Sequence, residues 1–222
     1  MTLSTVAHEL DSVLAGQADG IVHAVTERPF SSETVGAELA RRQFHVVATL
    51  SLFDAFIRYA EDPGRIDDPF LRETVGAEEV ESLARAGMLE AGPSADSMEI
   101  WRAETDAAMR DVGALNRLGV PVVLGTDVGN PRVFPGYSAH EELANLVKAG
   151  LTPLEAIRAG SVNAARMLGL EEEFGSVEVG KRADLLILDG DPLQDIRNSR
   201  RIRAVIAGGR LIDRQALLTM RK

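Results

Sequence analysis

The chain has 222 residues, of which 45% are hydrophobic and 26% charged, and it is therefore predicted to be globular with a sizeable core. Its formal net charge of -10 argues against nucleic acid or an anionic membrane surface as a partner, because like charges repel. The chain contains no cysteine, which excludes disulfides, thiolate metal sites and a cysteine nucleophile.

The N-terminal segment has the pattern of a helix and not that of an export signal. Apolar residues at helical spacing predict a helix over residues 4–14, which Gly16 would end. A basic stretch followed by an apolar core is missing here, and no apolar run in the chain reaches the about 18 residues of a membrane span. We therefore expect a soluble, cytoplasmic protein.

The next part of the chain predicts a strand–helix–strand unit followed by an insertion. Residues 20–25 (GIVHAV) and 44–53 (FHVVATLSLF) are rich in β-branched side chains and predict two buried strands, with a helix beginning at Ser31 between them. Residues 54–97 are acidic and interrupted by prolines. They predict a lid-like insertion with helical pieces around residues 71–90.

A third strand is expected after a long helix. Residues 98–118 have a helical pattern that ends directly before the apolar run at 122–126 (VVLGT). Two helices follow, at about 140–148 and 153–168, and Thr152 is the expected N-cap of the second.

The C-terminal part changes to short β-segments with Gly and Asp turns, at residues 175–192 and 201–214, which predict a small antiparallel sheet. The fold class is thus α/β. We expect one domain over residues 1–170 and a second, β-rich domain over residues 171–222.

Two polar residues stand where strands of a parallel sheet end. His23 ends GIVH and Asp127 ends VVLGTD, and in such sheets ligands bind at the carboxyl ends of the strands. An imidazole and a carboxylate suit zinc or another divalent metal ion, and an aspartate near a metal can also take a proton from water. This pattern predicts a metal-assisted hydrolase.

Each candidate also has a structural interpretation. His23 could be a satisfied polar group at a strand end, and Asp127 could form a turn with Gly125 and Gly129. His140 could point into the site from the loop after the last strand, or lie on the surface at a helix start.

The remaining histidines and the absence of certain motifs argue against other catalytic or nucleotide-binding sites. His45 begins its strand and His8 lies in the opening helix, so both are expected to be structural. No G-x-S-x-G motif, P-loop lysine motif or strand-linked G-x-G-x-x-G motif occurs.

Several motifs in a fixed order resemble a known family. LGTDVG, HEELANLVKAGLTPLEAIRAGSVNAARMLGL, GSVEVGKRADLLILDGDPLQDI and VIAGGRLID, within about residues 119–213, resemble the C-terminal half of the metal-dependent amidohydrolase superfamily, in its imidazolonepropionase- and prolidase-like branch. AGQADGIVH, residues 15–23, is similar to the sixth barrel strand of that family, and VVATL, residues 46–50, to the seventh.

The resemblance implies a (β/α)8 (TIM) barrel with a small β-sandwich, and hydrolysis of amide-type bonds in a small-molecule substrate by metal-activated water. On that mapping Asp127 is a metal ligand and the general base, and His23 is a metal ligand, as in binuclear members, or a water or substrate contact, as in some mononuclear ones. Zinc is the expected cofactor. Gly129 is expected to leave room for substrate, and His140 is a candidate substrate-binding residue.

The chain also departs from the family pattern. It contains no H-x-H pair, which supplies metal ligands from the first strand of the family. An eight-stranded barrel needs about 250 residues, whereas about 170 precede the β-rich tail. We therefore expect the C-terminal part of a barrel, with about three parallel strands, and part of a β-sandwich.

A barrel that lacks some of its strands has physical consequences. A cut barrel exposes a sheet edge and an apolar face, so we expect oligomers or association with a missing N-terminal half. Weak zinc affinity is also expected, because two candidate ligands fall short of the three of a catalytic site. Two alternatives remain: a catalytically silent fragment acting as a structural or binding module, and a small intact hydrolase using His23, Asp127 and His140.

Overall fold

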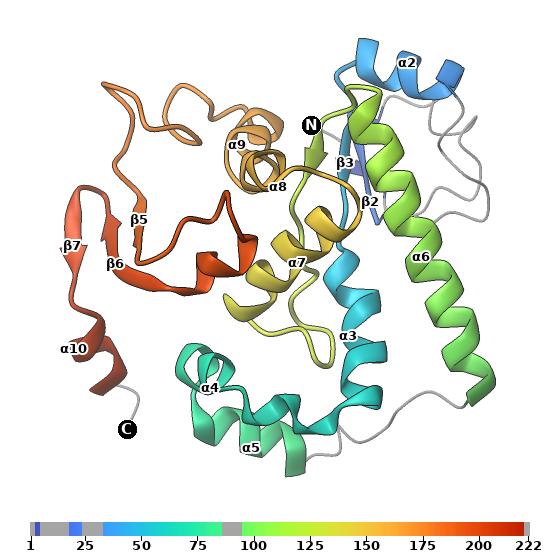
Figure 1. Ribbon diagram of the computed structural model, residues 1–222. Coiled ribbons are helices and arrows are strands. Elements are labelled where there is room, and N and C mark those ends of the chain that lie inside the picture. The colour runs from blue at the N-terminus through green and yellow to red at the C-terminus, as the bar shows by residue number, and fades with distance from the viewer. Residues whose placement is uncertain (1–2, 5–17, 24–32, 86–94, 220–222) are drawn as a thin grey trace.

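The chain folds as an α/β protein built on a parallel sheet, shown as a computed structural model in Figure 1. The structure describes residues 3–4, 18–23, 33–85 and 95–219. Four parallel strands stand in sequential order: β1 (Leu3–Ser4), β2 (Gly20–Val22), β3 (His45–Val47) and β4 (Val122–Val123). Strands β2, β3 and β4 are buried through apolar side chains such as Ile21, Val46 and Val122, each at most 1% exposed.

The first strand corrects the prediction for the N-terminal segment. Leu3 and Ser4 pair in parallel with Gly20 and Ile21, so Ser4 lies in a strand and the described sheet has four strands where three were expected. A two-residue strand carries no periodicity of its own, and its pairing across the sheet decides its conformation. The rest of the expected helix and His8 lie outside the described residues.

The strand expected over 44–53 is wrong in its second half. β3 ends at Val47, and helix α3 (Leu50–Glu61) begins three residues later. The first N–H groups of α3 have no local side-chain cap; the buried Glu142 carboxylate accepts hydrogen bonds from the N–H groups of Leu50 and Ser51 instead. A cap supplied from 91 residues away leaves no local signal in the sequence.

Short helices fill the segment that was expected to be an insertion. The 3₁₀ helix η1 (Pro63–Asp67) and the helices α4 (Pro69–Val75) and α5 (Ala77–Arg85) follow α3, which agrees with the predicted helical pieces. Prolines open η1 and α4, where a missing N–H costs nothing. These helices enclose a second apolar cluster, separate from the main core, of Ala55, Tyr59, Leu71, Val80, Val133, Phe134 and Tyr137.

Other helices cover the parallel sheet. They are α2 (Glu33–Arg41), α6 (Ala95–Arg117) and α7 (Tyr137–Lys148), and the main apolar core lies between them and the strands. No described helix is long and apolar enough to cross a membrane.

The helix expected over 153–168 is divided in two. Thr152 and Glu155 form the full capping box of α8 (Pro153–Ala159), which confirms the expected N-cap. α8 ends where Leu124, just after β4, donates its N–H to the carbonyl of Ala159, and α9 (Val162–Leu168) begins after a short break.

The C-terminal residues form the expected small antiparallel sheet, with strands β5 (Leu185–Leu188), β6 (Ile202–Ala207) and β7 (Arg210–Ile212) in that order. The 3₁₀ helix η2 (Ile196–Arg200) packs against α7, and helix α10 (Arg214–Thr219) follows the sheet. Figure 1 shows this sheet across α7 and α8 from the parallel sheet.

Candidate functional site

His23 and Asp127 lie together at the carboxyl edge of the parallel sheet. His23 directly follows β2, and Asp127 follows β4 more than a hundred residues later. The His23 Nε2 atom is 3.9 Å from the Asp127 Oδ2 atom. The two side chains keep 28% and 39% of their surface exposed, so a water molecule or a ligand can reach them.

The structure holds the His23 ring in one orientation. Its Nδ1 atom lies 2.8 Å from the hydroxyl oxygen of Thr49, in the turn between β3 and α3. The backbone N–H of His23 donates to the carbonyl of Val47, which extends the pairing of β2 with β3 by one residue. The Phe53 ring stands at 83° to the imidazole, 6.3 Å away between centroids. These contacts leave Nε2 as the nitrogen that faces Asp127.

Asp127 is fixed by Asn130, a residue that the sequence reasoning did not single out. The side-chain amide of Asn130 donates to the Asp127 Oδ2 atom at 2.9 Å and to the Asp127 carbonyl at 3.1 Å. These bonds form a turn at residues 127–130 and also orient the Asp127 carboxylate. An asparagine three residues after a strand-end aspartate is the signal that could have found it.

The two glycines around Asp127 have different roles. A Cβ atom on Gly125 would lie 2.4 Å from Val47 Cγ1 and 3.1 Å from Thr49 Cγ2, so only glycine fits without a shift. Gly129 has a φ of 116° and open space where a Cβ atom would be. It lines a cavity of about 190 Å³ together with Val128, the residue directly after Asp127, and Phe134.

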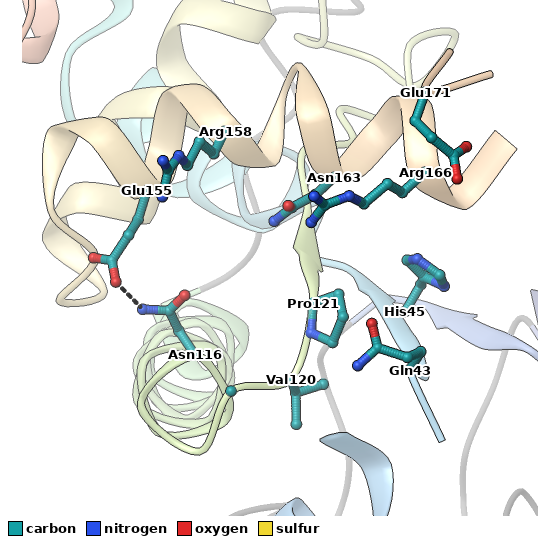
Figure 2. Close-up of a pocket in the computed structure, with 11 residues that line it drawn as sticks. Gln43, His45, Asn116, Val120, Pro121, Glu155, Arg158, Asn163, Arg166 and Glu171 are labelled. Atoms are coloured by element: carbon teal, nitrogen blue, oxygen red, sulfur yellow. Dashed lines mark hydrogen bonds between the residues drawn. The ribbon is translucent and has the colours of Figure 1, made fainter. Parts of the chain in front are cut away.

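A larger cavity lies at the opposite, amino-terminal edge of the sheet. It has a volume of about 590 Å³ and is lined by His45, at the start of β3, together with residues of α8 and α9 such as Arg158 and Arg166 (Figure 2). Burial lowers the pKa of His45. Ligand sites of parallel α/β folds lie at the other edge, so this cavity does not compete with the His23–Asp127 site, and His45 stands at the edge expected for a structural residue.

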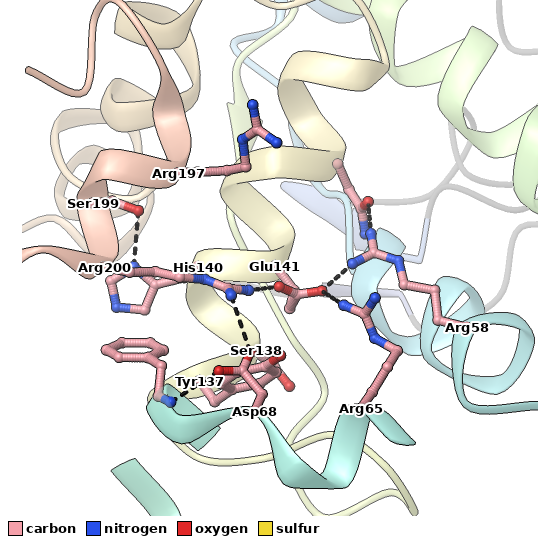
Figure 3. Close-up of polar contacts among 12 residues, drawn as sticks. Arg58, Arg65, Asp68, Tyr137, Ser138, His140, Glu141, Arg197, Ser199 and Arg200 are labelled. Carbon is pink, nitrogen blue, oxygen red and sulfur yellow. Dashed lines mark hydrogen bonds and ion pairs between the residues drawn. The ribbon is translucent and has the colours of Figure 1, made fainter. Parts of the chain in front are cut away.

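His140 stands apart from that pair. Its Nδ1 atom is 2.9 Å from the Ser199 hydroxyl oxygen, and its ring packs against Phe70 at a centroid distance of 5.1 Å (Figure 3). Burial and the nearby Arg200 charge lower the pKa of His140 to about 4. Among the described residues no three His, Asp or Glu side chains are grouped to hold a metal ion, so His140 does not join His23 and Asp127 in such a group.

A cluster of charges surrounds Glu141, next to His140. Arg58, Arg65 and Arg200 all pair with its carboxylate, and Arg200 also lies 3.3 Å from Asp68 (Figure 3). The arginines come from α3, η1 and η2, so the cluster joins the parallel-sheet part to the C-terminal part. Sequence patterns give no signal for it, because its members are far apart in the chain.

Comparison with known proteins identifies a family that this chain matches. The family model described as amidohydrolase family matches residues 81–212, more than half of the chain. The matched range contains Asp127, Gly129 and His140, whereas His23 precedes it.

Individual relatives agree with this match. An imidazolonepropionase of Sphingopyxis alaskensis is 45% identical over 85 residues, which are 37% of this chain and 21% of that protein. An ochratoxinase of Aspergillus niger is 33% identical over 121 residues, 51% of this chain and 24% of that protein. The chain therefore spans about a quarter or less of the length of these two relatives.

A solved structure shares the fold over nearly the whole chain. A Xaa-Pro dipeptidase with bound methionine in its active site superposes with a TM-score of 0.64 at 21% identity. The superposition covers 95% of this chain and 44% of the dipeptidase. At this identity the likeness is one of fold alone.

Proposed function

This chain belongs to the amidohydrolase family, and from that premise we propose that it carries part of the active site of a metal-dependent hydrolase acting on amide-type C–N bonds. The observation that supports the proposal is the approach of His23 Nε2 to within 3.9 Å of Asp127 Oδ2 at the carboxyl edge of the parallel sheet. The substrate class we propose is a small molecule with an amide-type bond.

His23 and Asp127 fit a divalent metal ion, with zinc the first choice, as two of its ligands. An imidazole nitrogen and a carboxylate oxygen are common zinc donors, and two donors on a tetrahedral zinc ion stand about 3.3 Å apart. The observed 3.9 Å is within a small side-chain adjustment of that spacing. A catalytic zinc site has three protein ligands, so a complete site needs at least one more.

The chemistry we propose is hydrolysis by an activated water molecule. The metal ion, when bound, polarises the amide carbonyl and lowers the pKa of the attacking water. Asp127 takes a proton from that water as its oxygen bonds to the carbonyl carbon, and gives the proton to the departing nitrogen as the C–N bond breaks. Asn130 keeps the Asp127 carboxylate in place, and Gly129 leaves space for the substrate.

We propose that residues 1–170 are part of a (β/α)8 barrel and residues 171–222 part of a β-sandwich. The sequential order of four parallel strands, with described helices between β2 and β3 and between β3 and β4, supports the first assignment. In the small sheet Ile187 and Leu211 lie on the same face and are 44% and 72% exposed, which supports the second assignment, because a sandwich would cover that face. Residues 54–97 would then be the lid over the carboxyl edge.

An open sheet of this kind is expected to associate. Within the described residues β1 and β4 each pair with one neighbour only, and such edges recruit further strands. We propose that the chain forms oligomers or joins an N-terminal half that supplies the remaining ligands. A sharp, monodisperse monomer by light scattering, with cooperative melting, would count against this.

The test combines metal analysis with a panel of amide substrates. It compares the chain alone with the chain extended by whatever its gene encodes upstream of Met1. Zinc binding is expected to be weak in the chain alone, stronger in the extended form and lost in Asp127→Ala, and hydrolysis should follow zinc. His140→Ala is the control that should retain zinc.

A second candidate function is a catalytically silent structural module, favoured by the turn in which Asn130 satisfies Asp127. That alternative predicts no hydrolysis in either form and zinc binding that does not depend on Asp127. Zinc retained in both His23→Ala and Asp127→Ala would therefore overturn the hydrolase proposal.

A further inference from the structure

Thr49 occupies an unusual position between β3 and α3. Its side chain is buried, with 2% exposed surface, and its backbone has a φ of 50°. A β-branched residue is seldom found in this left-handed region, because its side chain crowds the backbone there. Such a conformation persists only where surrounding contacts over-determine it.

The contacts that hold Thr49 come from three other segments. The N–H of Ala48, just before it, donates to the carbonyl of Val123 in β4. The Glu142 carboxylate fixes the first turn of α3, directly after it. The missing side chain of Gly125 leaves room for the Thr49 methyl group, which a Cβ atom there would approach to 3.1 Å. Thr49 is therefore seated rigidly, with its hydroxyl oxygen 2.8 Å from His23 Nδ1.

We propose that Thr49 is a positioning residue for His23: its hydroxyl oxygen accepts the Nδ1–H hydrogen bond and holds the imidazole in the tautomer whose unprotonated Nε2 faces Asp127. This inference rests on the proposed function, since only that tautomer offers the lone pair of Nε2, on the Asp127 side, to a metal ion. A neutral imidazole carries one N–H, and the partner of one ring nitrogen decides the state of the other.

The geometry favours this tautomer over its alternative. If the Thr49 hydroxyl donated to Nδ1, Nε2 would carry the hydrogen and face a carboxylate oxygen. Such a charge-assisted pair would close to a hydrogen bond of about 2.7–2.9 Å. The observed separation of Nε2 and Asp127 Oδ2 is 3.9 Å, which is too long for that hydrogen bond. This distance agrees with two hydrogen-bond acceptors that face each other without a hydrogen atom between them.

The test reads the tautomer directly, by ¹⁵N–¹H NMR of the His23 ring in the full chain, with the signals assigned through His23→Gln. The wild type should show the hydrogen on Nδ1. Thr49→Val keeps the branched shape and removes the hydroxyl, and should give mixed tautomers. Thr49→Ser keeps the hydroxyl and should resemble the wild type.

Zinc titration of the same proteins provides a second readout. Because loss of the partner of a ligating histidine weakens metal affinity about 10–100-fold, Thr49→Val should bind zinc at least tenfold more weakly, and Thr49→Ser should bind nearly as the wild type does. Near-ultraviolet circular dichroism shows whether each variant retains its packing.

The outcomes separate this inference from the proposed function. A wild-type ring protonated on Nε2 overturns the inference whatever the variants do, and so does a folded Thr49→Val whose tautomer and zinc affinity are unchanged. A hydroxyl-dependent Nδ1–H tautomer in a protein that binds no zinc would support the inference and refute the metal site.

Discussion

Three non-glycine residues with left-handed backbone conformations meet at the carboxyl edge of the parallel sheet. His23, Thr49 and Asp127 have φ values of 72°, 50° and 56°. Residues of this kind are uncommon and often mark functional sites, because the strain has to be held by the surrounding fold. All three lie at one imidazole–carboxylate contact, which indicates that the fold holds the side chains at this edge in fixed orientations.

Asp127→Asn tests the role of the carboxylate as the base. Asparagine has nearly the same shape and tolerates the left-handed region, so the free energy of unfolding should change little. It cannot take a proton from water, and the hydrolysis rate of the chain extended upstream should therefore fall about 100-fold or more. Asp106→Asn, on the exposed side of α6, is the matched control and should retain the rate. Full activity in Asp127→Asn would place the base elsewhere.

Gly125→Ala tests the close packing under the site. The new Cβ atom would lie 2.4 Å from Val47 Cγ1, so the strand or the side chain has to move. We expect a loss of about 1–3 kcal/mol in the free energy of unfolding, measured in urea. Gly64→Ala meets only a flexible Asp62 side chain, at 3.2 Å, and should cost less. Equal losses in the two variants would contradict this account.

The sequence predicts those elements whose signals are local. The capping box at Thr152 and the apolar strands β2, β3 and β4 could be recognised, because neighbouring residues carry the pattern. β1 and the start of α3 could not, since one depends on pairing across the sheet and the other on the distant Glu142 carboxylate.

In the candidate site, too, the sequence could predict some residues and not others. His23 and Asp127 could be found because parallel strands end at a common edge. Thr49 could not be singled out, since its role arises from contacts with distant segments. Asn130 stands only three residues after Asp127, and that local spacing could have pointed to it. For His140, the sequence left the direction of the side chain open, and the structure places its ring against Ser199.

The start of α3 should make stability depend on pH through Glu142. Burial raises the pKa of this carboxyl from 4.5 to about 7, although the N–H groups of Leu50 and Ser51 oppose the shift. Between these values the folded state binds more protons than the unfolded state. This contribution to stability is therefore full below pH 4.5 and is lost as the pH rises to about 7.

Urea unfolding at several pH values measures this contribution. The free energy of unfolding of the wild type should fall between pH 5 and 7.5 by on the order of 2 kcal/mol more than that of Glu142→Gln, which cannot ionise. Glu99→Gln, exposed on α6, should keep the wild-type slope. Parallel slopes for the wild type and Glu142→Gln would show that Glu142 is ionised throughout.

At the scale of the whole molecule, the Glu141 cluster joins the two parts of the chain. Arg58 and Arg65 reach Glu141 from the parallel-sheet side, and Arg200 reaches it from η2, beside the small sheet. The Arg200 guanidinium also lies 4.9 Å from the Tyr137 ring centroid, so both charge and aromatic contact hold η2 against α7. We therefore expect the Glu141 carboxylate to contribute to the attachment of the C-terminal part, beside contacts such as the pair of His140 and Ser199.

Glu141→Gln should therefore loosen the attachment of the C-terminal part. The substitution keeps the side-chain size but leaves Arg58, Arg65 and Arg200 close together without the carboxylate between them. Because the Glu141 side chain is only 12% exposed, we expect a loss on the order of 2–3 kcal/mol in the free energy of unfolding. Limited proteolysis should then cut between residues 169 and 196 before the rest of the chain.

Glu38→Gln is the control, because it removes a carboxylate that also pairs with two arginines, but on the exposed surface of α2. Solvent screens that cluster, so the unfolding midpoint and the cleavage pattern should stay unchanged. If Glu141→Gln behaved like Glu38→Gln, the apolar contacts of η2 alone would account for the attachment.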